Sequence, residues 1–455
     1  MTINRRDFLK ATSATLTCAS LGGMTSLLTN IKSHAAENGD YKALVCLFLY
    51  GGMDNHDTVI PYDTASHQRW AEIRSDIIAN QTTPRTRENL LPLTPLNAAQ
   101  FGNRQFALPK EFENIHQLFQ SGNAAIVGNV GPLIEPVTAT QFENDTASLP
   151  SRLFSHNDQQ ATWMSGTTEG AQYGWAGLYS DSLNSGDNTF ANITTSSGEL
   201  LLTGKNTAPY IISGGRALSL DVIEEADETL KAPLTNHFNT DYFQGSNTLA
   251  QDIRNKISQS FSANTQYNQA TENTSPLTTS FPRSRLGRQL ETVTKTIAAR
   301  DNLKSNRQVF TIALGGFDTH SDQARKIPKL QNQIDQSVAA FYQAMTELGL
   351  QDSVTLFTAA DFGRTLATNG DGTDHGWGAH HFVIGGAVQG QQIYGDIPVS
   401  ELGHELDAGS GRLIPTQSVD QYAAALGQWF GVEPDKLAEI FPNLSSLGEQ
   451  PAIFG

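Results

Sequence analysis

VTLFTAADFGRTLATNGDGTDHGWGAHHFVIGG, residues 354–386, sets a glycine-rich polar segment between two short apolar runs. The segment holds three histidines, three aspartates and one arginine. Short apolar runs bounded by Gly and Asp are typical of buried parallel strands, and in open α/β sheets ligands bind beyond the carboxyl ends of such strands. We therefore expect this polar segment to line a site at a sheet edge, with these residues there: Asp361, Arg364, Asp374 and His375.

A second apolar run, Leu44–Tyr50, has no polar interruption, as expected of a central strand that is covered on both faces. It ends in Gly51-Gly52, which allow the backbone to turn sharply and approach a ligand. Asp54 follows at the carboxyl end of this strand. A plain turn with an Asx cap is the alternative interpretation of the same residues.

A third strand is predicted at Val309–Leu314, and the chain continues as Gly-Gly-Phe-Asp-Thr-His. In an extended chain residues two apart project to the same side, so Asp318 and His320 would reach a common point. Apolar residues then recur at steps of three and four from 330 to 348, which predicts a helix that packs on the sheet. Strand, helix and strand in this order imply a right-handed parallel crossover, which brings Asp318 and Asp361 to one edge.

The remaining pattern predicts an α/β fold: a doubly wound, mainly parallel sheet with helices on both faces. Further strands are expected at 124–127 and 382–384, and helices at 286–300, 418–430 and 434–440. Residues 184–284 are rich in Asn, Thr, Ser and Gly and are predicted to form an irregular insertion, with a loop at 263–280. Because no linker divides the chain, we expect residues 36–455 to form one domain.

The N-terminus carries an export signal. Residues 4–10, NRRDFLK, form a twin-arginine motif that precedes a mildly apolar run and a small-residue cleavage site ending at Ala35. Residues 1–35 are therefore predicted to be a signal peptide, and the mature protein to reach the periplasm or the extracellular space without stable membrane insertion. Cys46 then remains as a lone cysteine, so no intrachain disulfide is expected.

The charge balance excludes one class of partner. The chain has 30 Lys and Arg against 46 Asp and Glu, a formal net charge of −16. Because phosphate backbones are bound by clustered basic side chains, nucleic acid is not an expected partner. The sequence identifies no protein partner.

Several of the predicted edge residues have the chemistry of metal ligands. Carboxylates combined with imidazoles suit divalent ions such as zinc, manganese or iron. A single histidine or aspartate in a loop is more often a hydrogen-bonded structural residue, so the prediction rests on their coincidence at one edge. The predicted ligands are Asp54, Asp318, His320, Asp361 and His375.

A second predicted group lies at Ser155 and His156. Ser155 is followed three residues later by an acid, which is typical of a helix N-cap. A helix N-terminus also stabilises an anion or a nucleophilic hydroxyl, although capping alone explains the pattern.

Three stretches together resemble a family of secreted bacterial proteins catalogued as domain of unknown function fifteen-oh-one. They are LFLYGGMDNHDTVIP, FTIALGGFDTHSDQ and ADFGRTLATNGDGTDHGWGAHHFVIGGAVQGQQIYGDIP, with GRLIPTQSVDQYAAALGQWFGV behind them. The resemblance spans essentially the whole mature chain. That family is similar to the alkaline phosphatase and sulfatase superfamily, which implies a doubly wound sheet and metal-dependent hydrolysis of phosphate or sulfate esters.

By this resemblance, Asp318 and His320 belong to one metal site and Asp361 to another. Asp54 corresponds to the metal aspartate after the first strand, and His375 to the late histidine. The chain departs from the superfamily at Phe362, where phosphatases have a histidine.

The catalytic roles follow from the same resemblance. Ser155 occupies the approximate place of the nucleophile, and His156 is expected to act as a ligand or a base. Arg364 is expected to clamp a tetrahedral anion or to pair with a structural carboxylate.

The predicted function is therefore an exported metal-dependent hydrolase, or a related transferase, with one or two divalent ions, zinc or manganese. Its substrate would be a small-molecule or polymer-borne phosphate or sulfate ester. The alternative is a non-enzymatic periplasmic binding or assembly protein with a degenerate metal site, and the phenylalanine at 362 favours that alternative.

Overall fold

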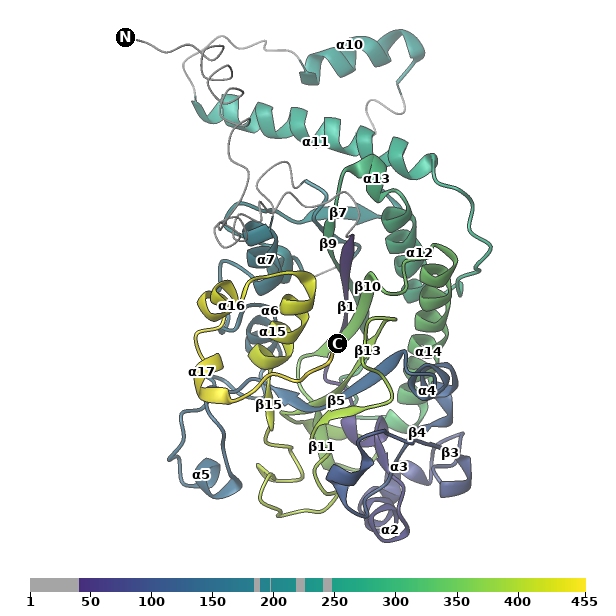
Figure 1. Cartoon of the computed structure of the whole chain (residues 1–455), viewed down its shortest axis with the longest axis vertical. Helices are drawn as coiled ribbons and strands as arrows, with labels where there is room; N and C mark the ends of the chain where they lie inside the picture. The colour runs from purple at the N-terminus through teal and green to yellow at the C-terminus, as the bar shows by residue number, and fades with distance from the viewer. Residues whose placement is uncertain (1–40, 184–188, 197, 218–225, 240–247) are drawn as a thin grey trace, which may run out of the picture. The chain divides into compact units, whose positions relative to one another are not determined.

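The computed structural model describes residues 41–183, 189–196, 198–217, 226–239 and 248–455. A ten-stranded sheet runs through this part of the chain (Figure 1). Its strands, in spatial order, are β14 (Ile393–Gly395), β5 (Ala124–Gly131), β13 (Ala379–Ile384), β10 (Val354–Ala360), β1 (Lys42–Tyr50), β9 (Arg307–Gly315), β6 (Asn192–Thr194), β7 (Tyr210–Ser213) and β8 (Arg216–Ala217), and β15 (Gln417–Ser418) pairs with β5.

The three strands at the centre run parallel and end at one level. β1 pairs with β10 on one side and with β9 on the other. Leu49 lies opposite Ala360, and Tyr50 lies opposite Gly315. Within the described sheet only β13 and β8 run against this direction. The mainly parallel α/β fold is confirmed, and the residues that follow β1, β9 and β10 share one edge.

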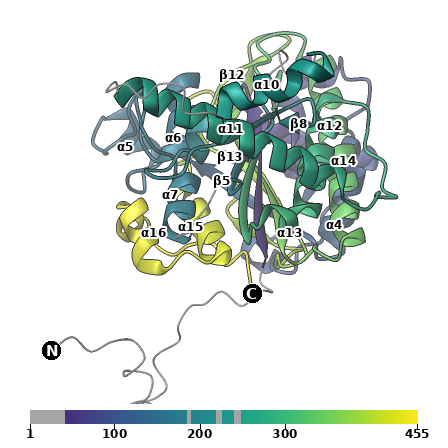
Figure 2. The same ribbon diagram turned by 90° about the horizontal axis from the view of Figure 1, so that it is seen from above.

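Helices cover both faces of the sheet, as Figure 2 shows from above. The side chains of β1 alternate between two cores: Val45 and Leu47 belong to one, and Leu44 and Cys46 to the other. The first core is covered by α4 (Glu113–Gln120), α12 (Arg285–Ala298) and α14 (Gln323–Glu347). The second is covered by α6 (His156–Ser165), α7 (Trp175–Leu183), α8 (Glu199–Leu202), α15 (Val419–Phe430) and α16 (Pro434–Ile440).

Smaller elements surround this core. β11 (Arg364–Thr368) and β12 (Thr373–His375) form a hairpin, and β2 (Ile60–Pro61), β3 (Leu90–Pro92) and β4 (Phe106–Pro109) form a separate sheet. The remaining helices are η1 (Asn55–Asp57), α2 (Thr64–Ile73), α3 (Ser75–Ile78), η2 (Arg87–Asn89), η3 (Ala98–Phe101), η4 (Lys110–Phe112), α5 (Ala139–Glu143), α10 (Glu228–Asn239), α11 (Thr248–Glu272), α13 (Arg300–Leu303) and α17 (Leu444–Leu447).

The predicted loop at 263–280 is wrong in its first part, because α11 extends to Glu272. Tyr267 in that helix is fully buried, and its hydroxyl lies 2.6 Å from Thr296 Oγ1 of α12. The small polar residues of this segment favour a loop, but the tertiary packing of one aromatic side chain stabilises it as a helix. The predicted signal peptide, residues 1–35, lies outside the described residues, and so do parts of the predicted insertion.

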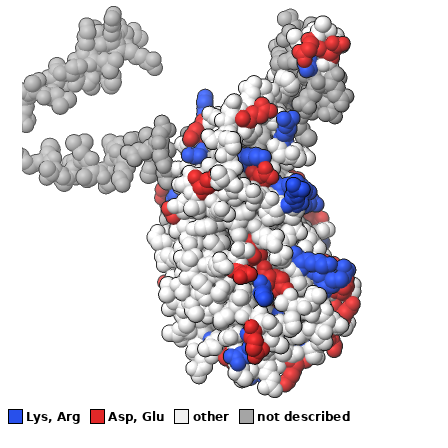
Figure 3. Space-filling model, turned by 90° about the vertical axis from the view of Figure 1, so that its right-hand side faces the viewer, with Lys and Arg blue, Asp and Glu red and all other residues white. Residues whose placement is uncertain are grey.

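The face of α12 and α14 carries acidic and basic side chains interspersed among uncharged ones (Figure 3). Among the described residues, no helix is both long and apolar enough to cross a bilayer. Cys46 is buried in the sheet, and burial raises the pKa of its thiol.

Asp420, in the first turn of α15, is expected to make stability pH-dependent. Burial raises the pKa of this carboxyl from 3.8 to about 7, so between pH 4 and 7 the folded protein holds a proton that the unfolded chain has released. Its contribution to stability is therefore present at low pH and is lost as pH rises toward 7. We expect Asp420→Asn to raise the free energy of unfolding at pH 8 by roughly 1 to 3 kcal/mol more than at pH 5.

Urea unfolding at the two pH values measures this difference. The matched control is Asp435→Asn, which removes an exposed carboxylate from the first turn of α16. Equal shifts for the two variants would contradict the role given to Asp420.

Candidate metal centre

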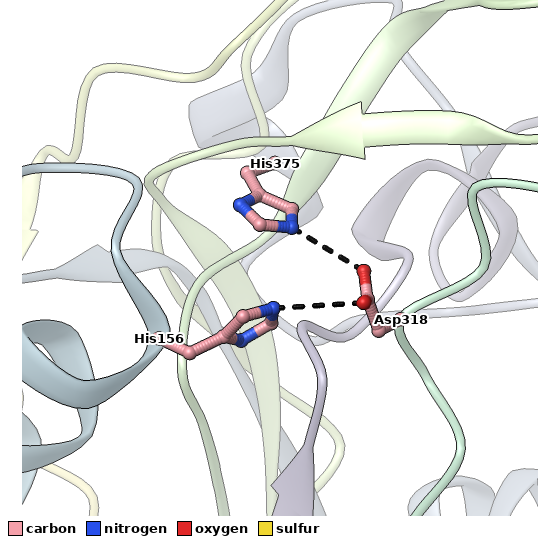
Figure 4. Close-up of side chains that lie close together, drawn as sticks. All are labelled: His156, Asp318 and His375. Carbon is pink, nitrogen blue, oxygen red and sulfur yellow. Dashed lines mark hydrogen bonds and ion pairs between the residues drawn. The ribbon is translucent and has the colours of Figure 1, made fainter.

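Three side chains from separate parts of the chain converge beyond the carboxyl ends of the central strands (Figure 4). Asp318 follows β9, His375 ends β12, and His156 begins α6. One ligand atom from each of these residues lies within 4.8 Å of the others. His320, two residues after Asp318, joins the same group, as the extended alternation predicts.

The contacts within this group are short. Asp318 Oδ1 lies 3.1 Å from His320 Nε2 and 3.3 Å from His375 Nε2, and the two Nε2 atoms are 3.0 Å apart. His156 Nε2 is 3.7 Å from Asp318 Oδ2. We call Asp318, His320, His375 and His156 the His–Asp cluster.

The other nitrogen of each imidazole faces an acceptor. His156 Nδ1 lies 2.5 Å from Asp361 Oδ2, His320 Nδ1 lies 3.3 Å from Asp374 Oδ1, and His375 Nδ1 lies 2.8 Å from the carbonyl oxygen of Phe154. Carboxylate and carbonyl oxygens only accept hydrogen bonds, so these three contacts are hydrogen bonds in the tautomer that carries the proton on Nδ1. Each Nε2 then presents a lone pair to the centre of the cluster.

Asp361 supports His156 rather than joining the cluster directly. Its Oδ2 also accepts hydrogen bonds from the backbone N–H of Gly51 at 3.2 Å and from Gln160 Nε2 at 3.0 Å. Its Oδ1 is buried and has no hydrogen-bond partner among the described residues. The hydrogen bond to Asp361 raises the pKa of His156, whereas burial lowers the pKa of His375.

Asp54, a predicted metal ligand, has a different set of partners. Arg74 donates to both of its oxygens, at 2.7 Å and 3.0 Å, and Gln323 Nε2 donates to Oδ2 at 2.6 Å. Both Asp54 and Arg74 are buried, with 1% of each side chain exposed. Asp54 therefore lies outside the cluster. Its oxygens accept hydrogen bonds from the buried guanidinium of Arg74, a residue that belongs to no recognisable motif in the sequence.

Arg364 is held by the protein rather than directed at an anion. Its Nη1 donates to Asp318 Oδ1 at 3.0 Å and to the carbonyl of Gly51 at 3.2 Å, and its Nε donates to Thr373 Oγ1 at 3.2 Å. Its Nη2 donates to the carbonyl of Thr373. The side chain is fully buried. Of its two predicted roles, the geometry gives it the pairing with a carboxylate, and Arg364 fixes the position of Asp318.

Ser155 is the N-cap residue of α6, as predicted, but its hydroxyl makes no capping hydrogen bond. Its Oγ donates instead to Asp158 Oδ2 at 2.8 Å. Phe362 packs against the cluster, since its ring centroid lies 4.8 Å from that of His156 and 4.6 Å from that of His375, and it offers no ligand atom there.

The model of the family described as "Protein of unknown function (DUF1501)" matches residues 41–409. The chain belongs to this family. The resemblance seen in the sequence is thereby confirmed. No curated protein sequence matches the chain.

Solved structures similar to this DUF1501 protein include hydrolases and a periplasmic domain. PsFucS1 sulfatase from Pseudoalteromonas sp. is 9% identical, with 87% of this chain and 68% of that chain covered and a TM-score of 0.38. The C-terminal periplasmic domain of EcEptC from Escherichia coli, in complex with Zn, is 9% identical, with 76% and 73% covered and a TM-score of 0.31. A mutant of alkaline phosphatase PafA is 14% identical, with 71% and 63% covered and a TM-score of 0.25. At these sequence identities and TM-scores, the similarity supports no statement about the chemistry of this protein.

The donor set of this DUF1501 protein fits one divalent ion. Three imidazole lone pairs and a carboxylate repel one another unless a cation or protons lie between them. Ligands bound at about 2.0 to 2.2 Å around a tetrahedral ion are roughly 3.3 Å apart, close to the contacts that join Asp318, His320 and His375. The acceptors on each Nδ1 are the supporting partners that metal-bound histidines ordinarily have.

Three residues that support Asp54 or the cluster, Gln160, Phe154 and Arg74, were not predicted from the sequence. Gln160, which contacts Asp361, lies four residues after His156 on the same helix, so the spacing was a usable signal. Phe154 contributes only its carbonyl, and Arg74 lies between α2 and α3 in a segment with no recognisable motif.

Proposed function

We propose that this DUF1501 protein is a metal-dependent hydrolase of phosphate or sulfate esters. The observation that carries the proposal is the convergence of three imidazole Nε2 atoms on one carboxylate at the carboxyl edge of a mainly parallel sheet. We assign Asp318, His320 and His375 as ligands of one divalent ion, zinc or manganese. Phe362 and the pairing of Asp54 with Arg74 favour a single ion.

The ion would act as a Lewis acid toward an ester oxygen. Arg364 holds Asp318 in place from within the protein, so the carboxylate is positioned before substrate arrives. Within the cluster, His156 lies slightly farther from Asp318 than the other two histidines do, and its hydrogen bond to Asp361 fixes the orientation of its ring, with Nε2 toward Asp318. In this assignment His156 takes a proton from the attacking water, and Asp361 stabilises the imidazolium that forms.

We also propose that the protein acts outside the cytoplasm. The twin-arginine motif in residues 4–10 and the cleavage site ending at Ala35 support export to the periplasm or beyond, and residues 36–455 would then form the mature domain. That route carries folded proteins, so an ion bound in the cytoplasm would stay in its site.

One observation favours the non-enzymatic alternative: ligand atoms of His156, Asp318 and His375 lie within 4.8 Å of one another. If His156 bound the ion together with Asp318, His320 and His375, four protein ligands would close the site, as in structural zinc centres. The purified mature protein tests the choice: metal content is measured first, and turnover of aryl phosphates and aryl sulfates is assayed afterwards. One bound ion with no turnover of either ester class would support a structural centre and overturn the hydrolase.

His156 and Ser155 are expected to respond differently to substitution. His156→Asn removes the proton acceptor and should lower kcat by about 10² to 10⁴. Ser155→Ala should change kcat by less than about threefold, because the serine hydroxyl is bound to Asp158 and does not face the cluster. Steady-state kinetics on an aryl ester measures both variants. A loss with Ser155→Ala as large as that with His156→Asn would instead identify the serine as the nucleophile.

A further inference from the structure

A shallow surface cleft of about 450 Å³ is connected to the His–Asp cluster through Gln160 and Asp361. One wall is α6, with Asn157 and Gln160, and Tyr50 ends the central strand β1 on another side. Gln160 belongs to both places, because its amide lines the cleft and also donates to Asp361, the partner of His156. Its volume is large enough for the alcohol part of a small ester.

The charged residues that line the cleft are all acidic. Glu169 and Glu199 line it, and no Lys or Arg does. Both glutamates are exposed, and within the part of the chain that the structure describes neither carboxylate has an ion-pair partner. Arg364, the arginine that contacts the cluster, is buried and already paired with Asp318. A ligand in this cleft therefore meets uncompensated negative charge.

Two kinds of contact are available to a cation there. Carboxylates attract an ammonium group and repel a second anionic group, with an energy that falls as salt is added. Tyr50 adds an aromatic side chain to the lining, and aromatic faces attract ammonium groups. The amides of Asn157 and Gln160 can accept hydrogen bonds from its N–H groups.

We propose that this cleft binds the leaving alcohol and selects an alcohol that carries an ammonium group. The preferred substrate class is then the phosphate or sulfate monoester of an amino alcohol or amino sugar, and densely anionic polymers are disfavoured. This inference rests on the proposed hydrolase function. It adds specificity through Glu169 and Glu199, which lie away from the proposed ligands.

A matched set of aryl esters tests the selection. Phosphates of three 4-substituted phenols are compared, the substituents being 2-aminoethyl, 2-hydroxyethyl and 2-carboxyethyl. We expect kcat/KM to be highest for the ammonium ester, lower for the neutral ester and lowest for the carboxylate ester. The ratio between the first and the last should be about tenfold at low salt, which is the scale of two exposed charge contacts. In about 0.5 M salt the ratio should be smaller, because salt screens exposed charges. Glu169→Gln combined with Glu199→Gln should bring the ratio between ammonium and carboxylate esters close to one.

The matched control is Glu433→Gln, which removes one exposed carboxylate before α16 and should leave the order as it is. If the three esters are hydrolysed equally, or if the double variant keeps the wild-type order, the selection is overturned while the hydrolase stands.

Binding provides a readout that does not need turnover. Tyramine, the alcohol of the ammonium ester, is titrated into the whole metal-loaded protein by calorimetry. Binding that the double variant weakens several-fold supports the cleft as an ammonium site even if no ester is hydrolysed, in which case the proposed function fails alone. Equal binding by wild type and double variant, or no binding at millimolar tyramine, overturns the inference.

Discussion

Replacing Asp318 with asparagine is expected to remove both the bound ion and the activity. Asp318 contacts His320, His375 and Arg364 at 3.0 to 3.3 Å, and asparagine keeps the shape but offers one weak oxygen donor in place of a carboxylate. Metal affinity should fall by at least about 100-fold, since even supporting residues of metal sites change affinity by 10- to 100-fold. Turnover should fall by roughly 10³-fold or more, which corresponds to several kcal/mol of transition-state stabilisation.

Two measurements separate loss of the ion from loss of the fold. Metal content after dialysis and kcat on an aryl ester give the effect, and urea unfolding of the metal-free proteins gives the stability. Asp322→Asn is the matched control, because Asp322 lies four residues further on and pairs with Arg325 at the surface. Full metal content in Asp318→Asn would sink the assignment of the cluster.

Replacing Arg74 with methionine should give the largest loss of stability. The substitution leaves Asp54 as a buried carboxylate without its cation, which costs about 3 to 5 kcal/mol. It also leaves the carbonyls of Thr365 and Leu366, which accept from Arg74, without that donor. The free energy of unfolding in urea measures the effect.

A double variant tests whether the uncompensated charge is the cause. Arg74→Met with Asp54→Asn should recover at least half of the loss, because asparagine is neutral and can still bond to Gln323. The surface pair of Lys436 and Glu439 gives the comparison: Lys436→Met should cost less than about 1 kcal/mol. If the double variant is as unstable as Arg74→Met, the buried charge is not what destabilises the single variant.

This pair also decides how Asp54 is understood. If Asp54 were a metal ligand rather than the partner of Arg74, Arg74→Met would disturb Asp54 and lower the metal content. Of these two variants, we expect only Asp318→Asn to lower it.

The sequence by itself determined the parallel centre of the sheet and much of its site edge. Apolar runs at 44–50, 309–314 and 354–358, interrupted only by threonines, identified the three central strands, because a strand covered on both faces carries few polar residues. Glycines and acids directly after those runs marked the edge, and the spacing of Asp318 and His320 placed both on one side. These signals are local, since each depends on neighbours along the chain.

Only the tertiary structure decided which polar side chains share a centre. His156 approaches Asp318 from a helix 162 positions earlier, and Asp54 is drawn to Arg74 instead of the cluster. Arg364 has its donors taken by Asp318 and by backbone oxygens of the protein, so it does not face a ligand. Each of these outcomes depends on which charges become buried together. An unpaired buried charge costs so much free energy that buried charges are paired, even when the two partners lie far apart in the sequence.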